Sequence, residues 1–217
     1  MQLRNMKIGI RAASVFALLG ALVLGMGLIA LYETRQMDKA TDEIRVTWMP
    51  AVVALSEISS NLGRARALTL RAALDDDDSE RARNLDLLKG INAQLTDGLK
   101  DYHDTIIAAD DRALFNTFND AHQQYLDLQT QVVDAISAGH IDQARQQING
   151  PLTLHADTMM KAMAALIAYN GKGAETASLR SSDVADEAFT AIIGALLVIM
   201  LALAGIATAL TRSIVVP

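Results

Sequence analysis

The sequence predicts an all-α protein, an antiparallel up-and-down four-helix bundle that is continuous with two transmembrane helices. The 217 residues include only 4% aromatic residues and 3 prolines, a composition that favours helices over sheet. Two long runs without a charged side chain flank an acidic middle segment. Within that segment, apolar residues recur at alternating steps of three and four, the spacing of helices that pack at shallow angles.

The two uncharged runs predict spans at 12–32 and 188–210. The runs cover 12–32 and 188–211, or 21 and 24 residues, and a helix needs about 20 residues to cross a bilayer. The first run is longer than the usual apolar core of a signal peptide and lacks a clear small-x-small cleavage site, so we expect it to be retained.

Charge predicts the orientation of these spans. All 25 acidic residues lie between Glu33 and Glu187, where 15 of the 19 Lys and Arg leave a net charge of −10. The other four cations, Arg4, Lys7, Arg11 and Arg212, flank the apolar runs. Because flanking cations stay in the cytoplasm, both ends (1–11 and 211–217) are expected inside and the domain 33–187 outside.

Four helices are expected within 33–187, each with an apolar seam. The first seam comprises Trp48, Val52, Leu55, Ser59, Leu62, Arg66, Thr69 and Ala73. The second comprises Leu85, Leu88, Asn92, Leu95, Leu99, Tyr102 and Ile106, and the third Leu114, Phe118, Ala121, Tyr125, Leu128, Val132 and Ala135. The fourth comprises Leu152, Ala156, Met159, Met163, Leu166, Asn170, Ala177 and Val184.

Turn-forming and capping residues separate these helices. Asp75–Ser79 breaks the first from the second, Asp110 and Asp111 cap the third, and Gly139 ends it. A short helix over 141–148 is followed by a predicted turn at Asn149-Gly150-Pro151. Gly171 and Gly173 are expected to interrupt the fourth helix as a kink or flexible point, since each costs about 1 kcal/mol against alanine.

Arginines without nearby carboxylates mark the far end of the first bundle helix. Between Glu57 and Asp75 there is no acidic residue, but Arg64, Arg66 and Arg71 lie there. Guanidinium groups bind carboxylates through paired hydrogen bonds, so we expect a small carboxylate to bind here. At the same level we expect Thr69, Arg81, Tyr125, Gln129 and Thr153, and His155 less firmly. Alternatively, Arg66 pairs with a carboxylate of another helix, and Arg64 and Arg71 are solvated.

Other site chemistries have little support. The net charge of −6 argues against nucleic acid as a partner. The four histidines show no metal-ligand spacing, and cysteine is absent, so no metal site or cofactor is expected. No phosphate loop or nucleophile elbow is present, and we expect no enzyme activity.

Three motifs carry a resemblance to a known family: Arg71-Ala-Ala-Leu-Asp75, Asn149-Gly-Pro-Leu-Thr153 and Thr211-Arg-Ser-Ile-Val-Val-Pro217. Together with the architecture, they resemble the sensor region of methyl-accepting chemotaxis proteins, in the four-helix-bundle class that includes the aspartate receptor. The first motif resembles the end of the first periplasmic helix, where family arginines hold ligand carboxylates across a dimer interface. Asn149-Gly-Pro-Leu-Thr153 resembles the start of the fourth helix, with its ligand-contacting threonine. Thr211-Arg-Ser-Ile-Val-Val-Pro217 resembles the opening of a HAMP linker.

The resemblance implies a periplasmic sensor anchored in the bacterial inner membrane. It further implies a homodimer or higher homo-oligomer that acts through a HAMP linker and a further signalling domain on a cytoplasmic chemotaxis kinase and its adaptor. An uncharged flank of the first helix, beside Arg64 and Arg71, could receive a second copy. Two family arginine positions fall on Leu62 and Ala67, so we expect an organic acid, such as a citric-acid-cycle intermediate, or an aromatic acid at least as readily as an amino acid.

Two other functions fit the same architecture. One is the input module of a histidine kinase or a cyclic-dinucleotide enzyme, since these share the linker. The other is a membrane-anchored helical hairpin that makes protein contacts and takes no small ligand.

Overall fold

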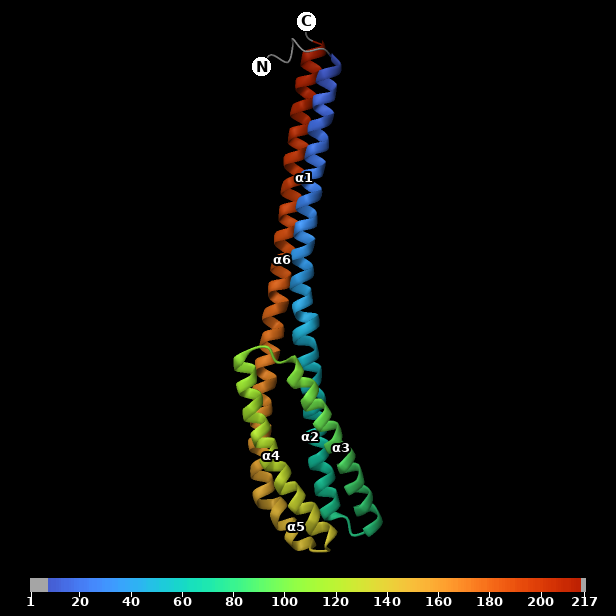
Figure 1. Cartoon of the computed structure of the whole chain (residues 1–217), viewed down its shortest axis with the longest axis vertical. Coiled ribbons are helices and arrows are strands. Elements are labelled where there is room, and N and C mark those ends of the chain that lie inside the picture. Colours follow the sequence, from blue (N-terminus) through green and yellow to red (C-terminus); the bar gives the residue numbers. More distant parts are fainter. Residues whose placement is uncertain (1–7, 216–217) are drawn as a thin grey trace. The chain divides into compact units, whose positions relative to one another are not determined.

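The computed structural model describes residues 8–215, and every regular element in that range is helical (Figure 1). The elements in chain order are α1 (Ile8–Glu43), η2 (Ile44–Trp48), α2 (Met49–Leu74), α3 (Asp78–Thr105), α4 (Ala109–Ser137), α5 (Ile141–Gln147), η3 (Ile148–Leu152) and α6 (Thr153–Val215). The segments η2 and η3 are single stretches of π-helix. The expected flanking cations Arg4 and Lys7, and Pro217 of the tail, lie outside the described residues.

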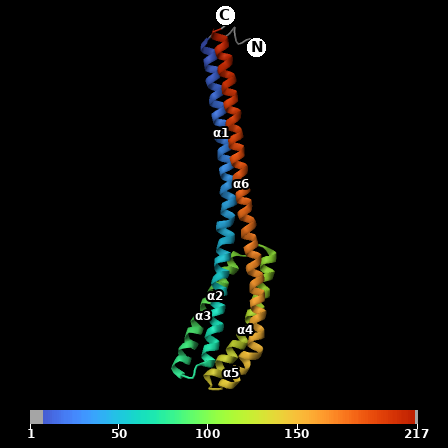
Figure 2. The same ribbon diagram turned by 180° about the vertical axis from the view of Figure 1, so that it is seen from behind.

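The chain divides into two compact units, 1–43 with 177–217, and 44–176. In the first unit, α1 and the last part of α6 run side by side and antiparallel, as both views show (Figures 1 and 2). Arg180 and Glu43 form an exposed ion pair there at 3.5 Å between Nη1 and Oε2. α1 and α6 each contain an apolar 18-residue stretch with none of its residues buried. Two helices are therefore long and apolar enough to span a membrane.

The second unit is the four-helix bundle. The turns that follow α2 and α4 lie at one end of it, here called the turn end, and the connection from α3 to α4 lies at the other (Figure 1). Its core consists mainly of fully buried apolar side chains, among them Leu55, Leu62, Tyr102, Phe118, Val132, Met159, Met163 and Leu166. Burying one such side chain contributes roughly 1.5–3 kcal/mol, which offsets the entropy lost in ordering the chain.

The buried rows of α2 and α3 differ from the predicted seams by one residue at most of the alternate positions. In α2, Leu55, Leu62, Thr69 and Ala73 are buried as expected, but the alternate row is Ala51, Ile58, Ala65 and Ala72. The predicted Val52, Ser59 and Arg66 lie at the edge of the core instead. In α3, likewise, Asn84 and Ile91 are buried, whereas Leu85, Asn92 and Leu99 are half-buried. The small alanines, with Gly98 opposite Ile58, allow α2 and α3 to approach closely.

Several of the predicted boundaries are confirmed. Asp77 is the N-cap of α3, and its Oδ1 accepts a 2.7 Å hydrogen bond from the backbone N–H of Ser79. Gly139 ends the α4 segment with a φ of 77°, a left-handed conformation that glycine adopts without steric cost. At the turn end, Arg145 of α5 donates from Nε to the carbonyl of Ala73 at 3.1 Å and ties α5 to α2.

Three local predictions are wrong. Asn149-Gly150-Pro151 is not a turn, because η3 continues the helix through it; the wider π-helical path accommodates a proline that lacks an N–H. Asp110 and Asp111 do not cap α4, whose N-cap is Ala108; Asp111 is buried and accepts from Tyr102 instead.

Gly171 and Gly173 do not interrupt the fourth helix, since α6 continues through both. A Cβ at Gly173 would overlap the indole ring of Trp48, whereas one at Gly171 would meet nothing. Trp48 also packs against Tyr169, with ring centroids 6.4 Å apart. Gly173 therefore permits a close approach between η2 and α6.

Candidate functional site

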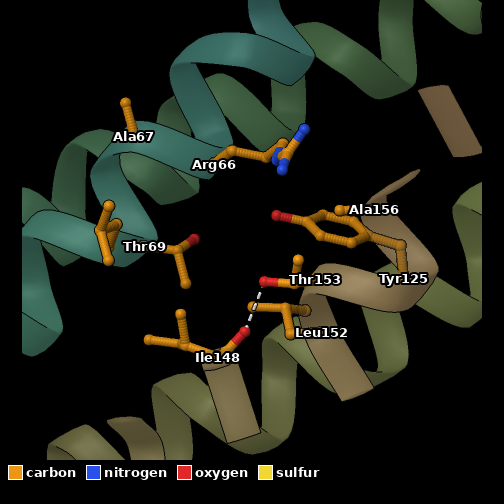
Figure 3. Close-up of a pocket in the computed structure, with 9 residues that line it drawn as sticks. Arg66, Ala67, Thr69, Tyr125, Ile148, Leu152, Thr153 and Ala156 are labelled. Atoms are coloured by element: carbon orange, nitrogen blue, oxygen red, sulfur yellow. Dashed lines mark hydrogen bonds between the residues drawn. The ribbon is translucent and has the colours of Figure 1, made fainter. Parts of the chain in front are cut away.

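A pocket of about 170 Å³ lies where α2, α4, η3 and α6 meet within the bundle (Figure 3). Its lining residues are Arg66, Ala67, Thr69, Leu70, Tyr125, Ile148, Leu152, Thr153 and Ala156. The volume is below the roughly 300–1,000 Å³ of pockets for drug-sized ligands. The pocket therefore suits a ligand of few non-hydrogen atoms.

Arg66 supplies the positive charge of the pocket. It follows Ala65 of the buried row, so its stem leaves the core at the edge, and 38% of its side chain is exposed. Its Nη2 lies 3.9 Å from Oδ1 of Asp157, whose side chain is 60% exposed. A pair this long and this accessible contributes at most about 1 kcal/mol, so the guanidinium can exchange this partner for another anion.

Two hydroxyl groups face the pocket beneath this guanidinium. Figure 3 shows the hydroxyls of Thr69 and Tyr125 pointing toward each other across the space. Both residues are buried, with exposed fractions of 1% for Thr69 and 2% for Tyr125. Burial raises the pKa of Tyr125, and the nearby Arg66 charge and its hydrogen bonds with Gln129 and Thr69 oppose that rise. Its phenol therefore stays protonated at neutral pH and can donate.

Gln129 holds both hydroxyls in place. Its Nε2 donates to Thr69 Oγ1 at 3.0 Å and to Tyr125 Oη at 3.2 Å. Its Oε1 accepts from Asn92 Nδ2 at 3.0 Å. Gln129 is 1% exposed, and all three of these polar contacts are internal. The hydrogen bonds of this buried amide contribute more to stability together than the sum of the separate bonds. Leaving one of its polar groups without a partner would cost about 1–3 kcal/mol.

The π-helical segment forms the opposite wall. Thr153 donates from Oγ1 to the carbonyl of Ile148 at 2.6 Å, drawn as the dashed line in Figure 3. This bond satisfies a carbonyl near Pro151, where the helical hydrogen-bond pattern is disturbed. Ile148 and Leu152 of the same segment line the pocket with apolar side chains.

Four of the seven predicted site residues line this pocket: Arg66, Thr69, Tyr125 and Thr153. Arg64 is exposed and donates to Asn61 Oδ1 at 3.1 Å, and Arg71 is exposed on α2. Arg81 bonds Asp78 and the carbonyl of Asp75, so it stabilises the turn between α2 and α3. The structure does not bring these three arginines onto the pocket, and the predicted cationic patch reduces there to Arg66.

The apolar lining residues were not predicted as part of the site. Ile148, Leu152 and Ala156 are spaced four residues apart, as on one face of a helix. Because Asn149-Gly150-Pro151 suggested a turn, that face was not recognisable across the proline. Ala67 and Leu70 lie near Arg66 on α2 and outside its buried row. The predicted seam therefore did not identify them as pocket residues.

A second buried polar group lies near the opposite end of the bundle. Tyr102 donates to Asp111 Oδ1 at 2.5 Å, and Asn170 Nδ2 donates to Tyr102 Oη at 2.7 Å and to Asp111 at 3.1 Å. Burial and the Asp111 carboxylate raise the pKa of Tyr102. These contacts join α3, α4 and α6, and we assign them a structural role.

A second, more open hollow of about 410 Å³ lies between α2 and α3. It is lined by Glu57, Ile58, Ser60, Asn61, Gln94, Asp97, Gly98 and Asp101. Among residues 8–215, no group of three or more His, Asp or Glu side chains could hold a metal ion.

Comparison with known families gives one finding. Residues 5–185 match the model of a family described as a four-helix-bundle sensory module for signal transduction. The match covers the first apolar run and the whole bundle, and it stops before the second run. No curated protein sequence matches the chain significantly.

Proposed function

The chain belongs to the four-helix-bundle sensory modules of methyl-accepting chemotaxis proteins, and on that premise we propose that it is a chemoreceptor sensor that binds a small carboxylate. Such a family is a signalling module and not an enzyme domain. The ligand site of the proposal is the pocket at Arg66.

The observation that carries the proposal is the grouping of a guanidinium and two hydroxyls around one small hollow. Arg66, Thr69 and Tyr125 come from two helices and line the same space. A guanidinium can hold a carboxylate through two parallel hydrogen bonds, and charge-assisted bonds of this kind are about twice as strong as neutral ones. Thr153 on α6 lines the side facing α2.

The pocket also suggests how binding is transmitted. α6 contains the lining residues Thr153 and Ala156 as well as the second apolar run, in one helix from 153 to 215. A ligand held between α2 and α6 favours the arrangement of these helices that fits it best. It shifts the equilibrium only by its affinity difference between the two arrangements. We place the bundle in the periplasm and both termini in the cytoplasm, on the charge pattern of the sequence.

Calorimetric titration of the full chain in lipid nanodiscs with a panel of small carboxylates tests the site. We expect Arg66→Ala to weaken binding at least tenfold, because a charge-assisted pair contributes about 1.5–3 kcal/mol. Arg64→Ala is the matched control, since Arg64 is on the same helix but not on the pocket. Equal affinities for the wild type and Arg66→Ala, or an equal loss in both variants, contradict the site.

A further inference from the structure

The hydrogen-bond direction at the floor of the pocket is fixed by Gln129. Its Oε1 accepts from Asn92, so its amide nitrogen faces the pocket side and donates to the oxygens of Thr69 and Tyr125. The side chain is 1% exposed, so water does not compete for these bonds. A glutamine with the reverse orientation would present an acceptor to the same two hydroxyls.

This direction decides what the two hydroxyls offer to a ligand. Each has one proton. Thr69 directs its proton to the carbonyl of Ala65 at 2.9 Å. Tyr125 already accepts from Gln129 and is hydrogen-bonded with the neutral Thr69 hydroxyl, so a carboxylate, the stronger acceptor, can take the Tyr125 proton in place of Thr69. The pocket thus presents the Tyr125 O–H and the Arg66 guanidinium, both donors.

Charged acceptors for a ligand's own protons are missing from the lining residues, because none of them is acidic. The acceptors there are neutral, among them the oxygen of Thr153, whose proton goes to the Ile148 carbonyl. The nearest carboxylate, Asp157, does not line the pocket and lies beside Arg66. An ammonium group in this space would lose hydration and find no carboxylate among the lining residues, which is unfavourable.

Charge and shape restrict the ligand further. Arg66 is the one cation among the lining residues, so a second carboxylate on the ligand would lack a counter-ion there. The rest of the wall is apolar: Ala67, Leu70, Ile148, Leu152 and Ala156. A short hydrocarbon body fits such a wall, since burying it stabilises the complex by about 0.8 kcal/mol for each CH₂ group.

We propose that Gln129 is a positioning residue that leaves the Tyr125 proton to the ligand in a pocket without acidic side chains, and that the pocket selects apolar monocarboxylates over amino acids and dicarboxylates. The inference rests on the proposed function, because it names the ligand class of the same pocket. It decides between the organic acid and the amino acid that the sequence left as alternatives.

Matched ligands on one carbon skeleton test the selection. The full chain in nanodiscs is titrated with three matched sets of compounds. The first set is butanoate with 2-aminobutanoate and butanedioate. The other two are 3-methylbutanoate with valine, and 3-phenylpropanoate with phenylalanine. We expect at least one monocarboxylate to bind, and its amino or second-carboxylate counterpart to bind at least tenfold more weakly. An amino acid or butanedioate that binds as tightly as its monocarboxylate overturns the inference while leaving an Arg66-dependent carboxylate site in place. Absence of binding by every compound overturns the proposed function and this inference together.

Two variants test the role of Gln129. Gln129→Glu keeps the size of the side chain but places acceptors at the floor, so the Tyr125 proton turns away from the ligand. We expect it to reduce monocarboxylate affinity at least tenfold and to reduce the discrimination against the amino counterpart. Tyr125→Phe removes only the donor, and we expect a loss of affinity with the melting temperature of the bundle retained. It gives a result even if Gln129→Glu does not fold. Unchanged monocarboxylate affinity in Tyr125→Phe contradicts the role of Tyr125 as a donor to the ligand and of Gln129 in positioning it.

Discussion

At the scale of single residues, the position of an arginine relative to the core decides whether it stabilises the fold or is available to a ligand. Arg66 and Arg81 are both arginines of the bundle, but Arg81 bonds a carboxylate and a carbonyl within its own turn. Arg66 has one distant, exposed partner, Asp157. The difference arises because Arg66 follows the buried Ala65 and projects at the core edge, where no other helix supplies a close acceptor.

Asp157→Asn tests whether this pair is structural or competes with a ligand. We expect the free energy of unfolding to change by less than about 1 kcal/mol, because both partners are accessible to water. We expect carboxylate affinity to rise, since the substitution removes a competing anion from Arg66. Chemical denaturation and calorimetry measure the two effects. A large loss of stability with unchanged ligand affinity supports the structural pair instead.

The stability of the bundle depends on pH through the buried side chain of His122. His122 is 8% exposed and stacks on Phe118 at 5.9 Å between ring centroids. Burial lowers its pKa from the usual 6.5, so the unfolded chain binds a proton before the folded chain does as the pH falls. The stability due to neutral His122 is therefore present above pH 6.5 and is lost below it.

Comparison with His122→Gln isolates this contribution. Between pH 7 and pH 5 we expect the wild type to lose more of its unfolding free energy than the variant, because the carboxylates that also titrate are common to both. Urea denaturation at each pH measures the difference. Parallel pH profiles would falsify the assignment.

At the scale of helices, small residues and π-helical segments set the contacts. Ala51, Ala65 and Ala72 bring α2 close to its neighbours, and η3 carries the chain through Pro151 without a turn. η2 ends at Trp48, whose ring covers Gly173 on α6. π-helical segments are frequently found at functional sites, and here η3 contributes two pocket residues.

The glycine pair of α6 offers a matched test of this packing. Gly171→Ala is expected to stabilise the bundle by up to about 1 kcal/mol, because alanine is the better helix former and nothing obstructs its methyl group. Gly173→Ala is expected to destabilise it by about 1–3 kcal/mol, because the methyl overlaps the Trp48 ring. Thermal unfolding followed by circular dichroism distinguishes them, and stabilisation by both substitutions contradicts the close approach.

At the scale of the whole molecule, the chain combines a water-facing bundle with two apolar helical stretches. The bundle has a continuous core that includes buried polar side chains such as Gln129 and Asp111, whereas the apolar stretches of α1 and α6 bury none of their residues in protein. A soluble core helix would be mostly covered. A bilayer supplies the apolar surroundings that these stretches require.

The absence of cysteine allows a clean test of orientation. Single substitutions Asp76→Cys, in the turn between α2 and α3, and Arg212→Cys, after the second apolar run, are introduced into the full chain. In intact cells we expect a membrane-impermeant maleimide to label Asp76→Cys alone, and both after permeabilisation. Labelling of Arg212→Cys in intact cells reverses the proposed orientation.

The sequence by itself determined the class of fold and the two stretches that are long and apolar enough to span a membrane. Charge segregation and length suffice for these stretches, because runs of 21 and 24 residues without a charge exceed the roughly 20 residues that a spanning helix needs. A repeat with steps of three and four suffices for a helical bundle with shallow packing. The repeat does not determine which rows of residues are buried. Leu55 and Leu62 belong to both the predicted and the observed row of α2, and apolar residues such as Val52 and Ile58 are available to either row.

Only the tertiary structure decided which polar residues meet. The helix lengths place seven predicted site residues at about one level of the bundle. Four of them line the pocket: Arg66, Thr69, Tyr125 and Thr153. The other three, Arg64, Arg71 and Arg81, lie elsewhere. The separation depends on the rotation of α2 by one residue and on the path of η3 through Pro151. Both result from packing against other helices, so the hydrogen bonds of Gln129 with Thr69 and Tyr125 follow from the assembled bundle and not from any local sequence pattern.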